Sequence, residues 1–153
     1  MFNIKVNTLN RILFFVILTW CLGFLWEFVI HIFPNSIYAL PILKYNYSIV
    51  CHTQPEKLFT IFNYSTLVCS RCAGIYFGGL VSIIIILFGY KKNISTKILL
   101  ISSIPLIIDV IFTTFRVYNY SQYFALVTGM LLGSLGFFYI HKSFVLLFTK
   151  NKG

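Results

Sequence analysis

The sequence predicts an all-α, polytopic membrane protein with four transmembrane helices and an interfacial Cys/His loop between the first two. Four apolar segments are each long enough to cross a bilayer as a helix. Hydrophobic residues make up 59% of the chain and charged residues only 10%, whereas average globular chains are roughly a quarter charged. Basic residues mostly flank the apolar segments. We therefore expect residues 1–153 to form a single integral membrane domain.

The first predicted helix covers residues 12–33, an apolar run that can span a core of about 30 Å. It is too long for the apolar part of a signal peptide and lacks a small-x-small cleavage site, so we expect it to remain in the protein. Glu27 and His31 lie near its end at i, i+4 spacing and share one helix face. Such an ionisable pair indicates either a functional site or two hydrated interface residues.

The chain between this helix and Cys51 is predicted to lie at the membrane interface. Pro34 and Pro41 argue against another spanning helix. The segment also carries Lys44 and three tyrosines, and tyrosine favours head-group depth. A polar loop, residues 51–72, follows and contains three of the four cysteines.

The second and fourth predicted helices, residues 72–90 and 123–148, each carry a Gly-x-x-x-Gly motif. Small residues at this spacing allow two helix backbones to approach closely in lipid. We expect these two helices to meet through their glycine faces. Self-association of two copies through one such face is the alternative.

The third predicted helix, residues 98–115, contains an acidic residue inside an apolar segment. A carboxylate in the membrane is unfavourable unless it is paired or hydrated, so Asp109 needs a partner. Arg116 lies on the same helical stripe and is the nearest basic candidate within this helix. Arg71, from the cysteine loop, is the alternative.

The cysteine loop offers a set of metal ligands. Cys51, His52, Cys69 and Cys72 supply three sulfurs and one imidazole, which match the tetrahedral set that zinc prefers. Adjacent residues rarely ligate the same ion, so His52 is expected either as fourth ligand or as a hydrogen-bond partner of a sulfur. In the second case Glu56, Asp109 or water would complete the set.

A redox role for the same cysteines is the competing interpretation. Cys69 and Cys72 form a Cys-x-x-Cys pair at the start of a predicted helix, where the helix dipole and Arg71 would favour thiolate. This pair could cycle between dithiol and disulfide, with Cys51 as a third participant. A structural disulfide, or inert thiols, is the simplest alternative.

The loop also resembles the signature of a prokaryotic membrane-protein family called domain of unknown function 2085, which reads roughly Cys-His, Pro-x-Arg-x-Phe and Cys-x-Arg-Cys-x-Gly-Ile-Tyr. The matching residues are Cys51-His52, Pro55-Glu56-Lys57 with Phe59, Cys69-Ser70-Arg71-Cys72 with Gly74-Ile75-Tyr76, and more weakly Asp109 and Thr128-Gly129. Lys57 stands where the family usually has arginine. The resemblance covers about residues 50–133 and implies a membrane protein without implying an activity.

The basic residues predict the orientation in the membrane. Four spans place both termini and the 91–97 loop on one side with eight basic residues, and the cysteine loop on the other side with four. The positive-inside rule then puts both termini in the cytoplasm of a multi-pass cell-membrane protein. Nearly all polar candidate residues of the helices lie at their outer ends, on the side of the cysteine loop, which favours a one-sided pocket over a channel that crosses the bilayer.

Three functions follow from these observations. The first is a binding module in which zinc clamps the loop above a pocket of Glu27, His31, Asp109 and Arg116 for a small polar ligand. The second is a membrane thiol-disulfide oxidoreductase with a thiol protein or quinone as partner. The third is a transporter or chaperone for a thiophilic metal. We expect no nucleic-acid partner, because the net charge of +9 flanks apolar runs rather than forming a soluble basic surface.

Overall fold

The computed structural model describes residues 6–51, 55–61, 64–90, 94–115 and 117–149. In chain order its elements are α1 (Val6–Phe24), α2 (Trp26–Ile32), the 3-10 helix η1 (Pro34–Ala39), α3 (Leu40–Val50), the 3-10 helix η2 (Pro55–Lys57), β1 (Leu58–Ile61), β2 (Tyr64–Cys69), α4 (Ser70–Leu87), α5 (Thr96–Thr114) and α6 (Gln122–Thr149). Within the described residues, α1, α4, α5 and most of α6 are long and apolar enough to cross a membrane. The predicted fold of four membrane-spanning helices is confirmed.

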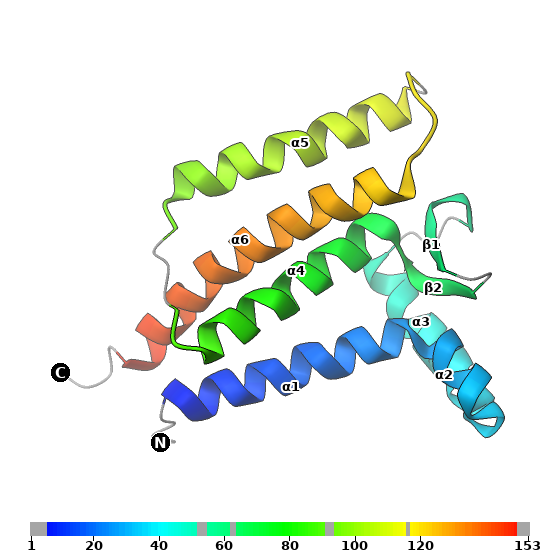
Figure 1. Cartoon of the computed structure of the whole chain (residues 1–153), viewed down its shortest axis with the longest axis horizontal. Coiled ribbons are helices and arrows are strands. Elements are labelled where there is room, and N and C mark those ends of the chain that lie inside the picture. Colours follow the sequence, from blue (N-terminus) through cyan, green and yellow to red (C-terminus); the bar gives the residue numbers. More distant parts are fainter. Residues whose placement is uncertain (1–5, 52–54, 62–63, 91–93, 116, 150–153) are drawn as a thin grey trace.

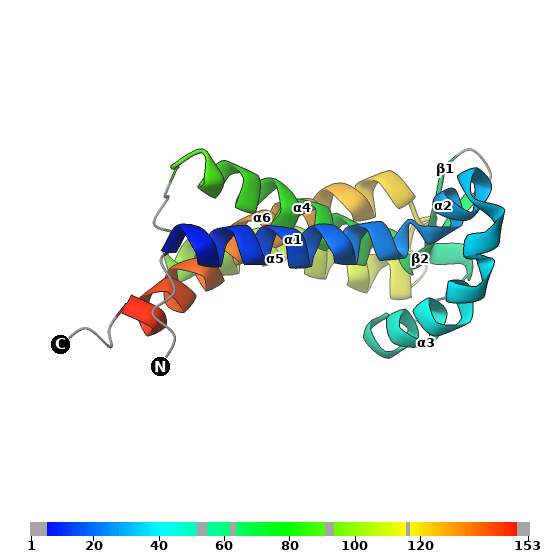
Figure 2. The same ribbon diagram turned by 90° about the horizontal axis from the view of Figure 1, so that it is seen from below.

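The four long helices lie side by side, in the order α1, α4, α6, α5 (Figure 1). The first residue of α1 and the last residue of α6 lie at one end, which we call the terminal end. The two strands, α2 and α3 gather at the opposite end, which we call the hairpin end (Figure 2). The segment that contains α2, α3 and the two strands therefore lies beyond one end of the helix bundle, along the long axis of the molecule.

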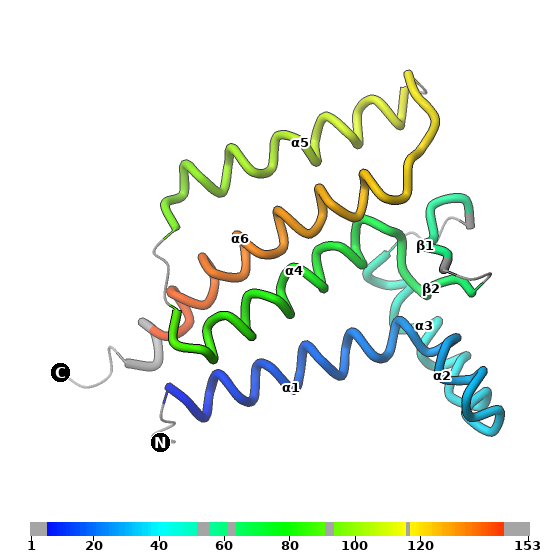
Figure 3. Tube along the Cα trace, in the orientation of Figure 1, coloured from blue at the N-terminus to red at the C-terminus, as the bar shows by residue number. Residues whose placement is uncertain are grey.

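Helices α4 and α6 form the centre of the bundle and run parallel, because α5 returns the chain between them (Figure 3). Glycines bring the two backbones into contact. A Cβ atom added to Gly78 would lie 2.4 Å from the carbonyl oxygen of Met130, and one added to Gly133 would lie 2.2 Å from that of Ile75. The predicted meeting of the two glycine faces is confirmed, and it occurs within one chain.

Helix α5 packs against α6 in a different way. Most of its apolar side chains are exposed on the surface of the chain, as expected for residues that face lipid, and its one buried residue is Asp109. This helix is attached to the bundle through a polar anchor rather than through an extensive apolar face.

The first predicted helix, residues 12–33, is broken in the structure. Helix α1 ends at Phe24, and α2 begins at Trp26 after Leu25. The indole Nε1 of Trp26 donates to the carbonyl oxygen of Ser36 at 3.0 Å, and Glu27 is bonded to β2. Contacts with later segments therefore hold α2 away from the axis of α1.

Two further features differ from the sequence-based expectation. The cysteine loop contains an antiparallel hairpin, in which Leu58 pairs with Cys69 and Thr60 pairs with Ser65. At the terminal end, His141 is buried and its Nε2 lies 2.8 Å from Oδ1 of Asn10, a polar contact that the sequence did not indicate. A buried polar pair therefore connects α1 and α6 at the terminal end.

Candidate metal centre at the hairpin end

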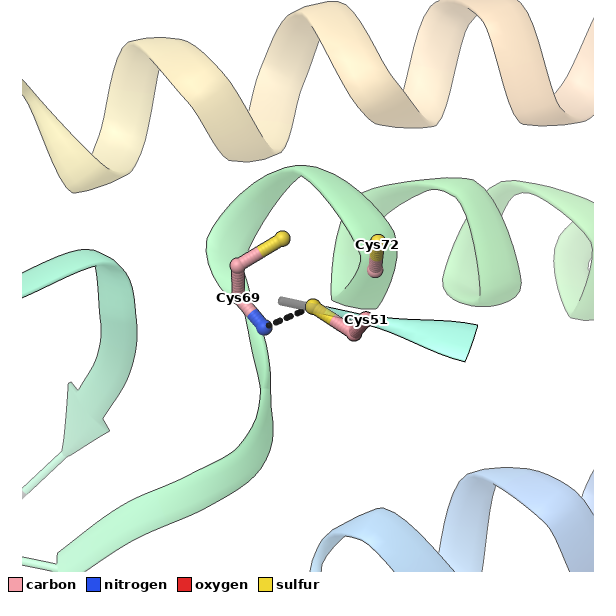
Figure 4. A group of neighbouring side chains, drawn as sticks. All are labelled: Cys51, Cys69 and Cys72. Atoms are coloured by element: carbon pink, nitrogen blue, oxygen red, sulfur yellow. Dashed lines mark hydrogen bonds between the residues drawn. The ribbon is translucent and has the colours of Figure 1, made fainter. Parts of the chain in front are cut away.

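Three cysteine sulfurs converge where the hairpin joins α4. Cys51 directly follows α3, Cys69 ends β2, and Cys72 lies in the first turn of α4. Their sulfur atoms all lie within 4.8 Å of one another (Figure 4). The amide N–H of Cys69 donates to Sγ of Cys51 at 3.2 Å, and Cys51 is buried while the other two are half-buried. Segments that are 18 residues apart in sequence are thereby brought to one point.

The arrangement fits a metal ion that prefers thiolates. Zinc–sulfur bonds of about 2.3 Å in a tetrahedron place the sulfurs about 3.8 Å apart. Sulfurs within 4.8 Å of one another need only small side-chain movements to reach that geometry. Among the described residues, no histidine or carboxylate joins the three sulfurs, so three thiolates are the ligands that the described chain offers.

The other predicted ligands have different positions. His52 lies outside the described residues, directly after Cys51. Glu56 is exposed in η2 and does not belong to the sulfur group. Asp109 is engaged elsewhere by Arg71. The fourth position on an ion would therefore be filled by His52, by water or by a bound ligand.

The thiols are electrostatically unequal. Hydrogen bonds from the Cys51 and Cys72 side chains lower the pKa of Cys69 well below its usual value. The hydrogen bond to Cys69 raises the pKa of Cys51. Cys69 is also the N-cap residue of α4, where backbone N–H groups favour negative charge. Thiolate character is thus concentrated on Cys69, which suits both metal binding and nucleophilic attack.

Arg71 links the cysteine cluster to α5. Its Nε lies 2.6 Å from Oδ2 of Asp109, which is 1% exposed. Its Nη2 donates to Oγ1 of Thr113 at 3.1 Å, and its guanidinium lies 5.4 Å from the centre of the Tyr120 ring. The hydroxyl of Tyr118 donates to the other oxygen of Asp109. Asp109 therefore has Arg71 as its partner, the alternative considered from the sequence, while Arg116 lies outside the described residues.

Glu27 and His31 contact the hairpin instead of the Asp109 pair. Oε2 of Glu27 accepts hydrogen bonds from the amide N–H and the hydroxyl of Ser65, at 3.0 and 2.9 Å. Nδ1 of His31 lies 2.9 Å from the hydroxyl of Tyr64. Of the four residues expected to share one pocket, Glu27 and His31 therefore contact the hairpin and Asp109 pairs with Arg71. The fourth, Arg116, lies outside the described residues.

A cavity of about 450 Å³ lies between α2, α3 and the hairpin. Its lining includes Glu27 from α2, Lys44 and Ser48 from α3, and Ser65 from β2. Sequence reasoning missed this cavity because it missed the hairpin. The β-branched and aromatic residues on both sides of Asn63 were the available signal for two strands.

Comparisons with known proteins agree with a membrane protein. Residues 51–139 match the family described as predicted membrane protein, DUF2085. The chain is 35% identical over 120 residues to an uncharacterized protein of the archaeon Methanocaldococcus jannaschii, and the match covers 75% of this chain and 70% of the relative. No solved structure matches the chain.

Proposed function

This chain belongs to the DUF2085 family of predicted membrane proteins, and we propose that it binds one thiophilic metal ion, most simply zinc, through Cys51, Cys69 and Cys72. His52 serves as fourth ligand or hydrogen-bonds a ligating sulfur. The observation that carries the proposal is the convergence of three sulfurs within 4.8 Å of one another from two separate segments. Zinc is redox-inert and would hold the thiolates in one arrangement.

On this proposal the metal has a structural role at a binding site. The segment between α3 and α4 is short, and its hairpin has only two strands, which are marginally stable alone. Metal binding supplies folding free energy to such a segment. The ion would clamp the hairpin against α3 and so maintain the cavity that Glu27 lines.

The same proposal places the hairpin end at the outer face of the cell membrane and both termini in the cytoplasm. It is supported by the eight basic residues of the terminal side against four on the hairpin side. Thiols on the outer side meet an oxidising environment, in which disulfides are expected. A bound metal would protect them.

Elemental analysis of the full-length protein, purified in detergent without added metal, tests the metal site. We expect about one metal ion per chain, with three thiols protected from alkylation until a chelator is added. Cys51→Ser, Cys69→Ser and Cys72→Ser should each lose most of the metal. Cys21→Ser is the matched control, because Cys21 is buried in α1 outside the cluster, and it should keep the full amount.

The loss of metal affinity in His52→Ala, compared with the loss in the cysteine variants, distinguishes the two roles of the histidine. A fall in metal affinity equal to that of the cysteine variants supports direct ligation. A smaller fall, of about 10–100-fold, supports a hydrogen bond to a ligand. Protein without stoichiometric metal and with an intact disulfide would contradict the metal site.

That contrary result would favour the second candidate, a thiol-disulfide oxidoreductase. Its specific support is the lowered pKa of Cys69 at the N-terminus of α4, with two further thiols in reach. The Cys69–Cys72 dithiol would release two electrons and two protons to a disulfide of a partner protein or to a quinone, and become a disulfide. A reversible midpoint potential measured by thiol alkylation in graded redox buffers would support this function.

A further inference from the structure

We infer that the cavity between α2, α3 and the hairpin binds a phospholipid head group that carries both a primary ammonium and a phosphate. Glu27 and Lys44 both line this cavity. Among the described residues, they form no ion pair with each other or with any other side chain. A ligand with one positive and one negative group would satisfy both charges at once.

The Glu27 carboxylate is oriented for a cationic donor. Ser65 donates two hydrogen bonds to Oε2, from its amide and from its hydroxyl. In the described structure Oε1 accepts no hydrogen bond, so it remains available to a ligand. A primary ammonium offers three N–H donors, whereas a quaternary ammonium offers none and is usually bound by aromatic cages. The carboxylate therefore favours an ethanolamine over a choline group.

The opposite charge in the cavity comes from α3. Lys44 is exposed, and a lysine ammonium binds phosphate as a point charge. Ser48, one turn later on the same helix, adds a hydroxyl to the lining. The anionic part of the ligand would therefore lie toward α3 and the ammonium toward α2.

The position of the cavity points to a lipid as the source of this group. Glu27 lies three residues beyond the end of α1, where the membrane span ends. On α3, Ile42, Tyr45 and Ile49 fall on one face and are 67%, 71% and 71% exposed. An exposed apolar face of this kind suits a helix that lies in the membrane interface. The cavity is thus at head-group depth.

This inference rests on the proposed function only in so far as the metal-clamped hairpin supplies the wall that contains Ser65. Metal content and lipid binding are separate measurements. A variant that loses lipid selectivity but keeps its metal would have a changed cavity. A variant that loses both would have lost the metal that clamps the hairpin.

Native mass spectrometry of the full-length protein in phosphatidylcholine nanodiscs with a minor fraction of phosphatidylethanolamine tests the inference. We expect bound lipid to be enriched in phosphatidylethanolamine by about tenfold, the ratio that one charge-assisted hydrogen bond supports. Glu27→Gln should abolish the enrichment. Lys44→Gln should lower the amount of either lipid retained about fivefold and leave the enrichment unchanged, since both lipids carry the phosphate and one basic residue near lipid contributes about 1 kcal/mol.

Glu56→Gln and Lys142→Gln are the matched controls, because both residues are exposed and neither is among the described residues that line the cavity. They should leave the enrichment unchanged. Glutamine keeps an acceptor for Ser65, and an unchanged melting temperature of Glu27→Gln would show that α2 still holds the hairpin. If that variant is destabilised, Lys44→Gln decides through the amount of lipid retained, because its side chain makes no hydrogen bond or ion pair within the described structure. Retention equal to that of the wild type would overturn the inference.

A competition experiment tests whether the head group alone is recognised. Displacement of bound phosphatidylethanolamine by soluble phosphoethanolamine, but not by phosphocholine, would support recognition through N–H donors. Equal displacement by both compounds would overturn the inference. Wild-type protein without enrichment, or Glu27→Gln with the wild-type enrichment, would overturn it as well.

Discussion

The α4–α6 pair and the hairpin end are held together by different interactions. In the pair, glycines remove side-chain volume so that helix backbones touch, as at Gly78 against Met130. At the hairpin end, the contacts run through sulfurs, carboxylates and hydroxyls, such as Glu27 with Ser65. Close backbone packing requires only complementary shape. Buried polar groups require their partners, so on the proposed function the hairpin end is the region that would depend on a bound ion.

Arg71 belongs to both regions. Its backbone carbonyl oxygen would lie 2.4 Å from a Cβ atom on Gly129, while its side chain pairs with Asp109. The residue therefore fixes α5 to the point where the cysteine cluster meets the bundle. Substitutions that affect only one of these two regions test the comparison between them.

The largest loss of stability should come from Asp109→Ala. This change leaves the half-buried guanidinium of Arg71 without its carboxylate and removes the one buried side chain of α5. Removing one partner of a buried ion pair typically costs about 3–5 kcal/mol. We expect a lowered free energy of unfolding in detergent, and faster proteolysis of the connection between α5 and α6. Glu56→Ala, at an exposed carboxylate, should have no comparable effect on either measurement.

A smaller loss is expected from Gly133→Ala. The added Cβ would lie 2.2 Å from the carbonyl oxygen of Ile75, so α4 and α6 must move apart. Such overpacking costs about 1–3 kcal/mol. The control is Gly136→Ala, whose Cβ would lie 3.8 Å from Leu99, an ordinary contact. Thermal unfolding that ranks the two variants equally would contradict the glycine packing.

The smallest effect is expected at the terminal end. Asn10→Ala removes the hydrogen bond to buried His141, and one such bond contributes about 0.5–1.5 kcal/mol. The metal content should not change, because the pair lies at the other end of the molecule (Figure 1). Asn119→Ala, at an exposed position, serves as control. A loss of metal in Asn10→Ala would show that the two ends are coupled more strongly than their interactions indicate.

The sequence predicted the apolar bundle well and the hairpin end only in part. Apolar length defines spans in lipid, and the glycine spacing identified the two helices that touch. The break at Leu25 could not be predicted, because the apolar run continues through it and the cause is a set of contacts with distant residues. In the same way, the sequence allowed two arginines for Asp109. Helical spacing favoured Arg116, whereas the structure pairs Asp109 with Arg71 across two helices.

Hydrogen exchange of the full-length protein before and after chelation is the most direct test of the account. It asks whether a metal stabilises the hairpin end while helix packing alone stabilises the bundle. We predict that removal of the metal accelerates exchange of the amides of β2, including that of Cys69, which donates to Cys51. Amides of α4 beyond Gly74 and of α6 should keep their protection. Unchanged exchange in β2, or equal acceleration throughout the bundle, would contradict the account.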